Sequence, residues 1–233
     1  MKRWKKAAYI YFQICTTESF PLITPISMEK SYAPLLNSVH FPFIEEIAKP
    51  TKPVNGQKEA AMKQLYLIGG PMGVGKTTVC QLLKAKLPRS VFLDGDWCWD
   101  ANPFQVTEET RAMVLDNICH LLNNFLRCSA YDHVLFCWVL HRQDILDAIL
   151  DRLYLEGCRV FCLSLVCSPA ALAARLEGDI QAGRRTPDVL ARSAAYLPLY
   201  AGLSTRKLDV TSLTPEQAAE ALAALCAPAP PAA

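Results

Sequence analysis

Net charge is nearly absent from this chain, because 24 Lys and Arg residues face 22 Asp and Glu residues and leave a formal charge of +2. Residues 1–61 carry +3 and residues 62–233 carry −1. Proteins that bind nucleic acid or membrane surfaces through bulk charge need a clear basic excess. We therefore expect neither a nucleic-acid partner nor a membrane partner, and any affinity for phosphate has to be local.

Glycine is almost missing from the first 61 residues, which hold only Gly56 of the ten glycines but six of the 16 prolines. The basic start "MKRWKK" and the partly apolar stretch after it lack a clear cleavage site, and the stretch is too short to span a bilayer. We expect residues 1–61 to be a poorly ordered extension or linker, with Met62 as a possible working start. A membrane anchor and a folded module are the alternatives.

Cysteine is plentiful, but a secretion signal and a zinc-type spacing are missing. Most of the ten cysteines lie inside apolar runs, where a free thiol behaves as a small core residue. We expect reduced cysteines and a cytoplasmic protein. A metal site is conceivable in one group of residues, although the spacings match no zinc pattern: Cys119, His120, His133, Cys137 and His141.

Apolar runs alternate with helical patterns from residue 62 onward. Strands are predicted at 64–70, 90–96, 133–140, 159–167 and 206–211, and helices at 75–87, 107–128, 142–157, 168–183 and 214–226. Continuous apolar strands separated by helices indicate a parallel sheet covered on both faces. The sequence thus predicts an α/β three-layer sandwich with five parallel strands over residues 62–227, followed by a flexible tail at 228–233.

The stretch "LYLIGGPMGVGKTT" contains the pattern G-x-x-x-x-G-K-[ST] between a predicted strand and a predicted helix. Glycines let backbone amides turn inward to form a nest for phosphate, and the following helix adds its free N–H groups. Lysine reaches the β- and γ-phosphates, and the threonine hydroxyl ligates Mg²⁺. The pattern predicts binding of ATP with Mg²⁺ by nine residues: Gly70, Pro71, Met72, Gly73, Val74, Gly75, Lys76, Thr77 and Thr78.

Two aspartates end the second predicted strand in the stretch "FLDGDW". As alternate residues of an extended segment, Asp94 and Asp96 would share one side. One carboxylate could hold the Mg²⁺ shell, with Asp94 and Thr77 as the metal residues, and the other could accept a proton from an attacking hydroxyl. The alternative is a loop pair that begins a turn.

Residues 62–215 resemble the small P-loop kinases, which include shikimate, gluconate and adenylylsulfate kinases and chloramphenicol phosphotransferase. "GGPMGVGKTT" is similar to their phosphate loop, "LDGD" to their acidic motif, and "LVCSPAALAARL" to their fourth strand and the helix before their lid. "KLDVTSLTPEQAAEAL" is similar to their last strand and helix, which border the adenine. The resemblance implies a P-loop NTPase fold with a small arginine-bearing lid.

The lid segment "RLEGDIQAGRRTPDVLARS" carries Arg175, Arg184, Arg185 and Arg192. By the resemblance, Arg184 or Arg185 closes over the transferring phosphate, where a guanidinium matches phosphate oxygens with two N–H donors. The alternative is a solvated basic helix face. The third predicted strand ends without the aspartate that many P-loop NTPases place near Mg²⁺. His141 and Arg142 follow it instead, and they either face the acceptor or lie exposed at the start of the next helix.

The acceptor region is expected between the acidic motif and the third strand. Trp97, Trp99 and Phe104 either stack on a planar ring or seat the helix in the core, and Arg111 either pairs with an acidic acceptor or lies outside. The predicted catalytic residues are Lys76, Asp94, Asp96, Arg184 and Arg185. They indicate a kinase acting on a small molecule or nucleotide, as a monomer or homodimer. A regulatory ATP/GTP switch is the alternative, and a polynucleotide-end kinase is disfavoured by the slightly acidic charge.

Overall fold

The computed structural model describes residues 62–226, so the predictions for residues 1–61 and 228–233 lie outside the described part. Its centre is a five-stranded sheet with the order β2-β3-β1-β4-β5. All neighbouring strands pair in parallel. The strands are β1 (Lys63–Gly69), β2 (Ser90–Asp94), β3 (His133–Cys137), β4 (Cys158–Val166) and β5 (Arg206–Asp209).

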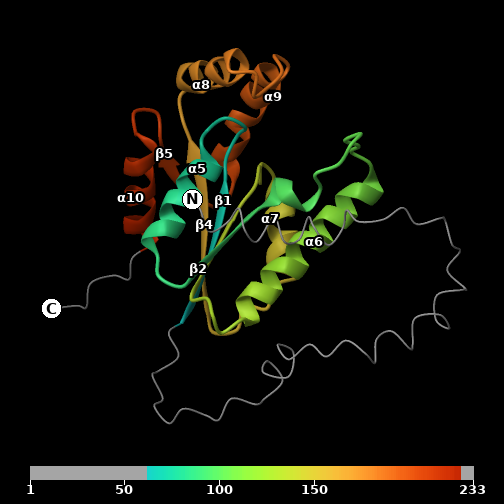
Figure 1. The fold of residues 1–233 in the computed structure, drawn as a ribbon, viewed down its shortest axis with the longest axis vertical. Helices are drawn as coiled ribbons and strands as arrows, with labels where there is room; N and C mark the ends of the chain where they lie inside the picture. Colours follow the sequence, from blue (N-terminus) through green and yellow to red (C-terminus); the bar gives the residue numbers. More distant parts are fainter. Residues whose placement is uncertain (1–61, 227–233) are drawn as a thin grey trace, which may run out of the picture. The chain divides into compact units, whose positions relative to one another are not determined.

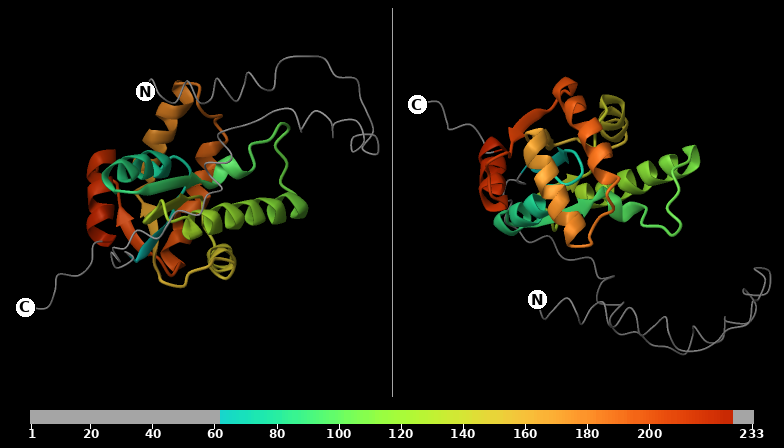
Figure 2. Two further views of the ribbon diagram at one scale, coloured as in Figure 1. Left: turned by 60° about the horizontal axis from the view of Figure 1, so that its bottom comes forward. Right: turned by 90° about the horizontal axis from the view of Figure 1, so that it is seen from above.

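Helices connect the strands and cover both faces of the sheet (Figures 1 and 2). The α-helices are α5 (Lys76–Lys86), α6 (Glu108–Arg127), α7 (Gln143–Leu150), α8 (Pro169–Gln181), α9 (Val189–Tyr196) and α10 (Pro215–Cys226). Two 3₁₀ helices are η2 (Gly95–Cys98) and η3 (Leu197–Gly202). None of the helices between residues 62 and 226 is both long and apolar enough to cross a membrane.

Two hydrophobic cores, one on each face, follow from the alternation of side chains along the strands. On β1, Tyr66 and Ile68 belong to the core beneath α5, α8 and α10, while Leu65 and Leu67 belong to the core beneath α6 and α7. All four side chains are at most 2% exposed. The predicted three-layer α/β sandwich with five parallel strands is therefore confirmed.

The ends of several helices also agree with the sequence prediction. Thr107 caps α6 in a capping box with Thr110. Ser168 caps α8, with Pro169 in the first turn.

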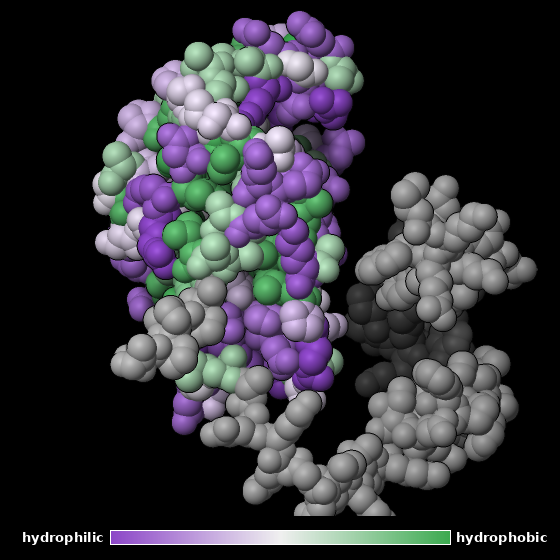
Figure 3. All heavy atoms as spheres, turned by 90° about the vertical axis from the view of Figure 1, so that its left-hand side faces the viewer, coloured by the Kyte–Doolittle hydropathy of each residue, from purple (hydrophilic) through white to green (hydrophobic). Residues whose placement is uncertain are grey.

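Apolar and hydrophilic residues alternate over the surface on the α10 side of the molecule (Figure 3).

Three predictions about the elements were wrong. The second strand ends at Asp94, because the Asp94 carboxylate accepts a hydrogen bond from the Asp96 amide and starts η2. Helix α7 ends at Leu150, well before Gly157, because a turn follows that buries Leu153 in the core. Helices α9 and η3 were not predicted, although the spacing of Val189, Ser193 and Leu197 is helical.

Candidate active site

The loop between β1 and α5 has a backbone that only glycine adopts readily. Gly73 and Gly75 have φ angles of 82° and 105°, in the left-handed region. A Cβ on Gly70 would lie 2.8 Å from the Leu165 carbonyl oxygen, and one on Gly73 would lie 2.4 Å from the Leu176 side chain. The glycines are therefore required both for the turn and for the close contact with β4 and α8.

The Lys76 ammonium folds back over this loop. Its Nζ donates to the carbonyl oxygens of Gly70 at 2.8 Å and Pro71 at 3.0 Å. Burial lowers the pKa of Lys76, and the charges of Asp96 and Asp94 partly oppose that shift. A cation held over the N-terminus of α5, where backbone N–H groups have no partner inside the helix, makes this loop a site for a polyanion.

Thr77 and Asp94 meet at the mouth of the loop. The Thr77 hydroxyl donates to Asp94 Oδ2 at 2.6 Å, and Asp94 is only 6% exposed. The register of the sheet brings them together, because Asp94 pairs with Cys137 of β3, which in turn pairs with Ile68 of β1. Two hard oxygen donors beside a phosphate site suit Mg²⁺, which usually takes one or two protein ligands together with phosphates and waters.

No group of three or more His, Cys, Asp or Glu side chains suited to a metal ion occurs within residues 62–226. The conceivable zinc group therefore does not assemble. The nine cysteines of this region are free thiols, most of them buried or half-buried.

Asp96 lies beside this pair but is exposed, so the expectation that the two aspartates share one side of an extended strand was wrong. Trp138 Nε1 donates to Asp96 Oδ1 at 3.1 Å and holds the carboxylate in place. Partial loss of water around the carboxyl group raises the pKa of Asp96, and so does the negative charge of the neighbouring Asp94. The charge of Lys76 and the hydrogen bond from Trp138 oppose this rise. Gly95 allows this arrangement, because a Cβ there would lie 2.5 Å from the Trp138 ring.

Both candidate lid arginines bind one carboxylate at the end of α8. Arg184 contacts Asp179 at 2.8 Å and Arg185 contacts it at 3.1 Å. Their environments differ, because the Arg185 side chain is 38% exposed and the Arg184 side chain is 64% exposed, and the charge of Arg185 is one of those that lower the pKa values of Lys76 and Asp96. Arg185 is therefore the better placed of the two for a phosphate, and Asp179 is a partner it would have to share or release.

Arg175 and Ser193 support the loop from the lid side. Arg175 donates to the carbonyl oxygens of Val74 and Val210 at 3.2 and 2.6 Å, which ties the loop to the end of β5. The fully buried Ser193 donates from its hydroxyl to the Met72 carbonyl oxygen at 2.6 Å. The remaining arginine of the predicted lid, Arg192, pairs with Asp188.

Sequence reasoning missed Ser193, Trp138 and Tyr200. The hydroxyl of the buried Tyr200 donates to the Val139 carbonyl oxygen, which also accepts from the Gly70 amide. Trp138 follows an apolar strand and reads as part of it, and no local motif marks Ser193 or Tyr200. Their roles depend on contacts more than 40 residues away in sequence.

The aromatic residues after Asp96 divide between two places. Trp97 packs edge-on against Phe92, with ring centroids 5.4 Å apart, on the α5 side. Trp99 packs against Phe104 and Trp138 at 4.8 and 6.2 Å, on the α6 side. The structure thus brings Trp99 and Phe104 together and leaves Trp97 apart.

The polar residues after β3 do not face the loop as a pair. The exposed Arg142 forms an ion pair with Asp144. The His141 ring stacks on Tyr196 of α9 at 4.3 Å, and among residues 62–226 its buried Nδ1 has no hydrogen-bond partner. Arg111, on the first turns of α6, is exposed.

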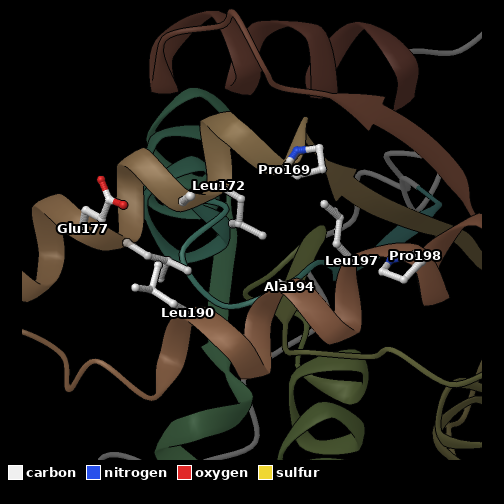
Figure 4. A pocket seen from close by; sticks show the side chains of 9 residues that line it. Pro169, Leu172, Glu177, Leu190, Ala194, Leu197 and Pro198 are labelled. Atoms are coloured by element: carbon white, nitrogen blue, oxygen red, sulfur yellow. The ribbon is translucent and has the colours of Figure 1, made fainter.

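A cavity of about 670 Å³ lies between α8 and the α9–η3 segment (Figure 4). Eight of its nine lining residues are Pro, Leu or Ala, and the ninth is Glu177, whose charge would repel a phosphate. The site is therefore placed at the glycine loop, where cationic and N–H donors converge, and not in this cavity.

The sheet order, the glycine loop and the Lys76–Thr77–Asp94 cluster define a P-loop NTPase fold. A family model described as an AAA domain matches residues 67–190, more than half of the 233-residue chain, and the chain belongs to this family. No curated protein matches the chain in sequence.

Three solved structures show the same fold. A tunicamycin resistance protein from Deinococcus radiodurans is 21% identical, with 70% of this chain and 95% of that chain covered at a TM-score of 0.55. A gluconokinase from Sinorhizobium meliloti is 20% identical, with 70% and 94% covered at 0.50. A sugar kinase from Janibacter sp. is 17% identical, with 70% and 93% covered at 0.50. The predicted resemblance to the small P-loop kinases is confirmed in the fold.

Proposed function

We propose that the protein is an ATP-dependent phosphotransferase that moves the γ-phosphoryl group to a small-molecule or nucleotide acceptor. The observation that carries the proposal is the position of Asp96. Its exposed carboxylate lies next to the buried Asp94, which accepts from Thr77, and within the field of Lys76, at the mouth of the loop. A switch protein needs no such exposed carboxylate beside the phosphate site, whereas a kinase uses one to orient the acceptor hydroxyl.

The residues divide the work as follows. The loop amides and Lys76 bind the phosphates, and Thr77 and Asp94 would hold Mg²⁺, which neutralises phosphate charge when bound. The acceptor oxygen forms a bond to the γ-phosphorus while the bond from that phosphorus to the β–γ bridging oxygen breaks. ADP leaves, and the acceptor proton passes to Asp96. Arg185 stabilises the charge on the transferring group, with Arg184 as the alternative.

The adenine would lie near the last strand and helix, within residues 207–222, as the resemblance to the small P-loop kinases implies. The contact from Arg175 to Val210 supports this placement, because it brings the lid helix to that segment. We further propose a cytoplasmic protein that is monomeric or homodimeric.

The test is ADP release from Mg²⁺-ATP across a panel of nucleosides, sugars, sugar acids and hydroxylated aromatic compounds. The proposal would be supported by an acceptor that raises the turnover of the wild-type protein many-fold and leaves the turnover of Lys76→Ala and Asp96→Asn unchanged. Slow turnover that no acceptor changes would instead favour the regulatory NTPase.

A further inference from the structure

An apolar pocket is lined by residues that follow the proposed base, Asp96, along the chain. It has a volume of about 280 Å³, room for a single small ring system. It lies between the segment after η2 and the start of α6. Its lining residues are Trp99, Ala101, Pro103, Phe104, Gln105, Thr110 and Met113, and none of these seven is charged.

Ring contacts join this pocket to Asp96. Trp138 donates to the Asp96 carboxylate at 3.1 Å, the Trp138 and Trp99 rings lie 6.2 Å apart, and Trp99 lies 4.8 Å from Phe104. Asn117 Nδ2 donates to the Cys98 carbonyl oxygen at 3.0 Å and holds η2 against α6. Packed rings thus connect the lining of the pocket to the proposed base.

Core packing explains only part of this cluster. Trp99 and Trp138 are half-buried against the core beneath α6. Phe104 and Met113, by contrast, are 57% and 45% exposed. Large apolar side chains that are exposed together around a concave site are typical of a surface that a ligand covers.

The charge around the pocket excludes one class of ligand. The segment 94–113 carries five acidic residues and one basic residue, Arg111. A carboxylate or phosphate entering the pocket would lose water and gain no cationic partner in its lining. Sugar acids and nucleotides are therefore poor candidates for this position.

We propose that the acceptor is a hydroxyl compound that carries no negative charge and places a flat apolar ring between Phe104 and Met113, with its hydroxyl directed to Asp96. This inference rests on the proposed phosphotransferase function. It narrows the acceptor from any hydroxyl or phosphate compound to one chemical class.

Binding to the full-length chain with saturating ADP tests the inference without turnover. Calorimetric titrations would compare thymidine with thymidine 5′-monophosphate and tyrosol with 4-hydroxyphenylacetate, each pair sharing a ring and differing by an anion. Glucose and gluconate serve as the non-planar pair. We expect the two uncharged ring compounds to bind at least about tenfold more tightly than their anionic partners. Glucose binding as well as they do, or an anion binding best, would overturn the inference, and so would binding of no ring compound.

Variants locate the binding. Phe104→Ala should weaken the ring compounds at least about fivefold through lost stacking, and Tyr154→Ala, which removes an aromatic ring 49% exposed elsewhere, should leave them unchanged. Gln105→Lys should shift the preference toward thymidine 5′-monophosphate at least about fivefold, because it supplies the missing cation. Equal losses in the Phe104 and Tyr154 variants would place the binding elsewhere. If the titrations show the expected binding but no compound causes release of ADP from ATP, the proposed phosphotransferase function is wrong and the ring-binding pocket is still supported.

Discussion

The phosphate loop and the proposed acceptor pocket are formed by different kinds of group. The loop is made of backbone, with glycines at positive φ and carbonyl oxygens tied to Lys76, Arg175 and Ser193. The pocket is made of side chains, chiefly exposed aromatic and apolar groups on a connecting segment and one helix. The loop would bind phosphate through backbone groups that every residue possesses, whereas the proposed pocket would select its acceptor through particular side chains.

Removing the Lys76 cation should produce the largest loss, because the phosphates then lose the only side-chain ammonium held over the loop among residues 62–226. We expect Lys76→Ala to lower kcat/KM about 10²- to 10³-fold with the fold retained. Lys86→Ala is the control, since it removes an exposed lysine paired with Glu220 at the far end of α5. Steady-state kinetics would measure kcat/KM, and circular dichroism would check that the fold is retained. A fully active Lys76→Ala protein would overturn the assignment of the loop to phosphate binding.

Neutralising Asp96 should act on the chemical step and spare nucleotide binding. Asp96→Asn is expected to lower kcat about 10²-fold, because the carboxylate that receives the acceptor proton is gone. The affinity for ADP, measured by calorimetry, should change little, since Thr77 and Asp94 remain in contact. A variant with normal kcat but weakened ADP binding would show that Asp96 serves the nucleotide instead.

Adding one methyl group to the loop should separate backbone from side-chain effects. Gly73→Ala puts a Cβ 2.4 Å from the buried Leu176 at a φ of 82°, so we expect about 1–3 kcal/mol of destabilisation and weaker ATP binding. Gly178→Ala, in open space within α8, should instead stabilise the fold by about 0.5–1 kcal/mol. Thermal unfolding of both variants, with and without ADP, would show whether the two substitutions change the stability in opposite directions.

The two lid arginines provide a finer comparison, because both contact Asp179. The Arg185 side chain is the less exposed of the two, at 38% against 64% for Arg184, and its charge is one of those that lower the pKa values of Lys76 and Asp96. Arg185→Ala should therefore lower kcat about tenfold or more, and Arg184→Ala should lower it less. The test compares the kcat values of the two variants at saturating ATP. The reverse order would assign the phosphate contact to Arg184.

The smallest effect is expected from removing residues 1–61, because every residue assigned to the proposed site lies at Gly70 or later in the chain. A chain that starts at Met62 should keep its kcat and KM within about twofold, the usual scatter of such comparisons. An insoluble or inactive product would show that the first 61 residues contribute to the domain.

Much of this molecule was readable from local patterns. The glycine loop identified Lys76 and Thr77, and the apolar runs predicted the parallel sheet, because phosphate nests and buried strands each need a particular local sequence. The relation between Asp94 and Asp96 was misjudged, because a hydrogen bond from the Asp96 amide turns the chain into η2 where an extended strand was expected. The end of α7 and the existence of α9 were missed for a similar reason: burial of Leu153 and Ser193 against distant segments decides where those helices lie.

The sequence by itself determined the ligand of the loop, since the residues that bind phosphate are consecutive and their chemistry is local. Only the tertiary structure decided which side chains surround the proposed acceptor pocket. Trp138 follows β3, Trp99 follows η2 and Met113 belongs to α6, whereas Trp97 packs against Phe92 on the other face of the sheet. Those residues are distant or misleading along the chain, because side-chain neighbours are set by strand register and helix packing, which local sequence does not encode.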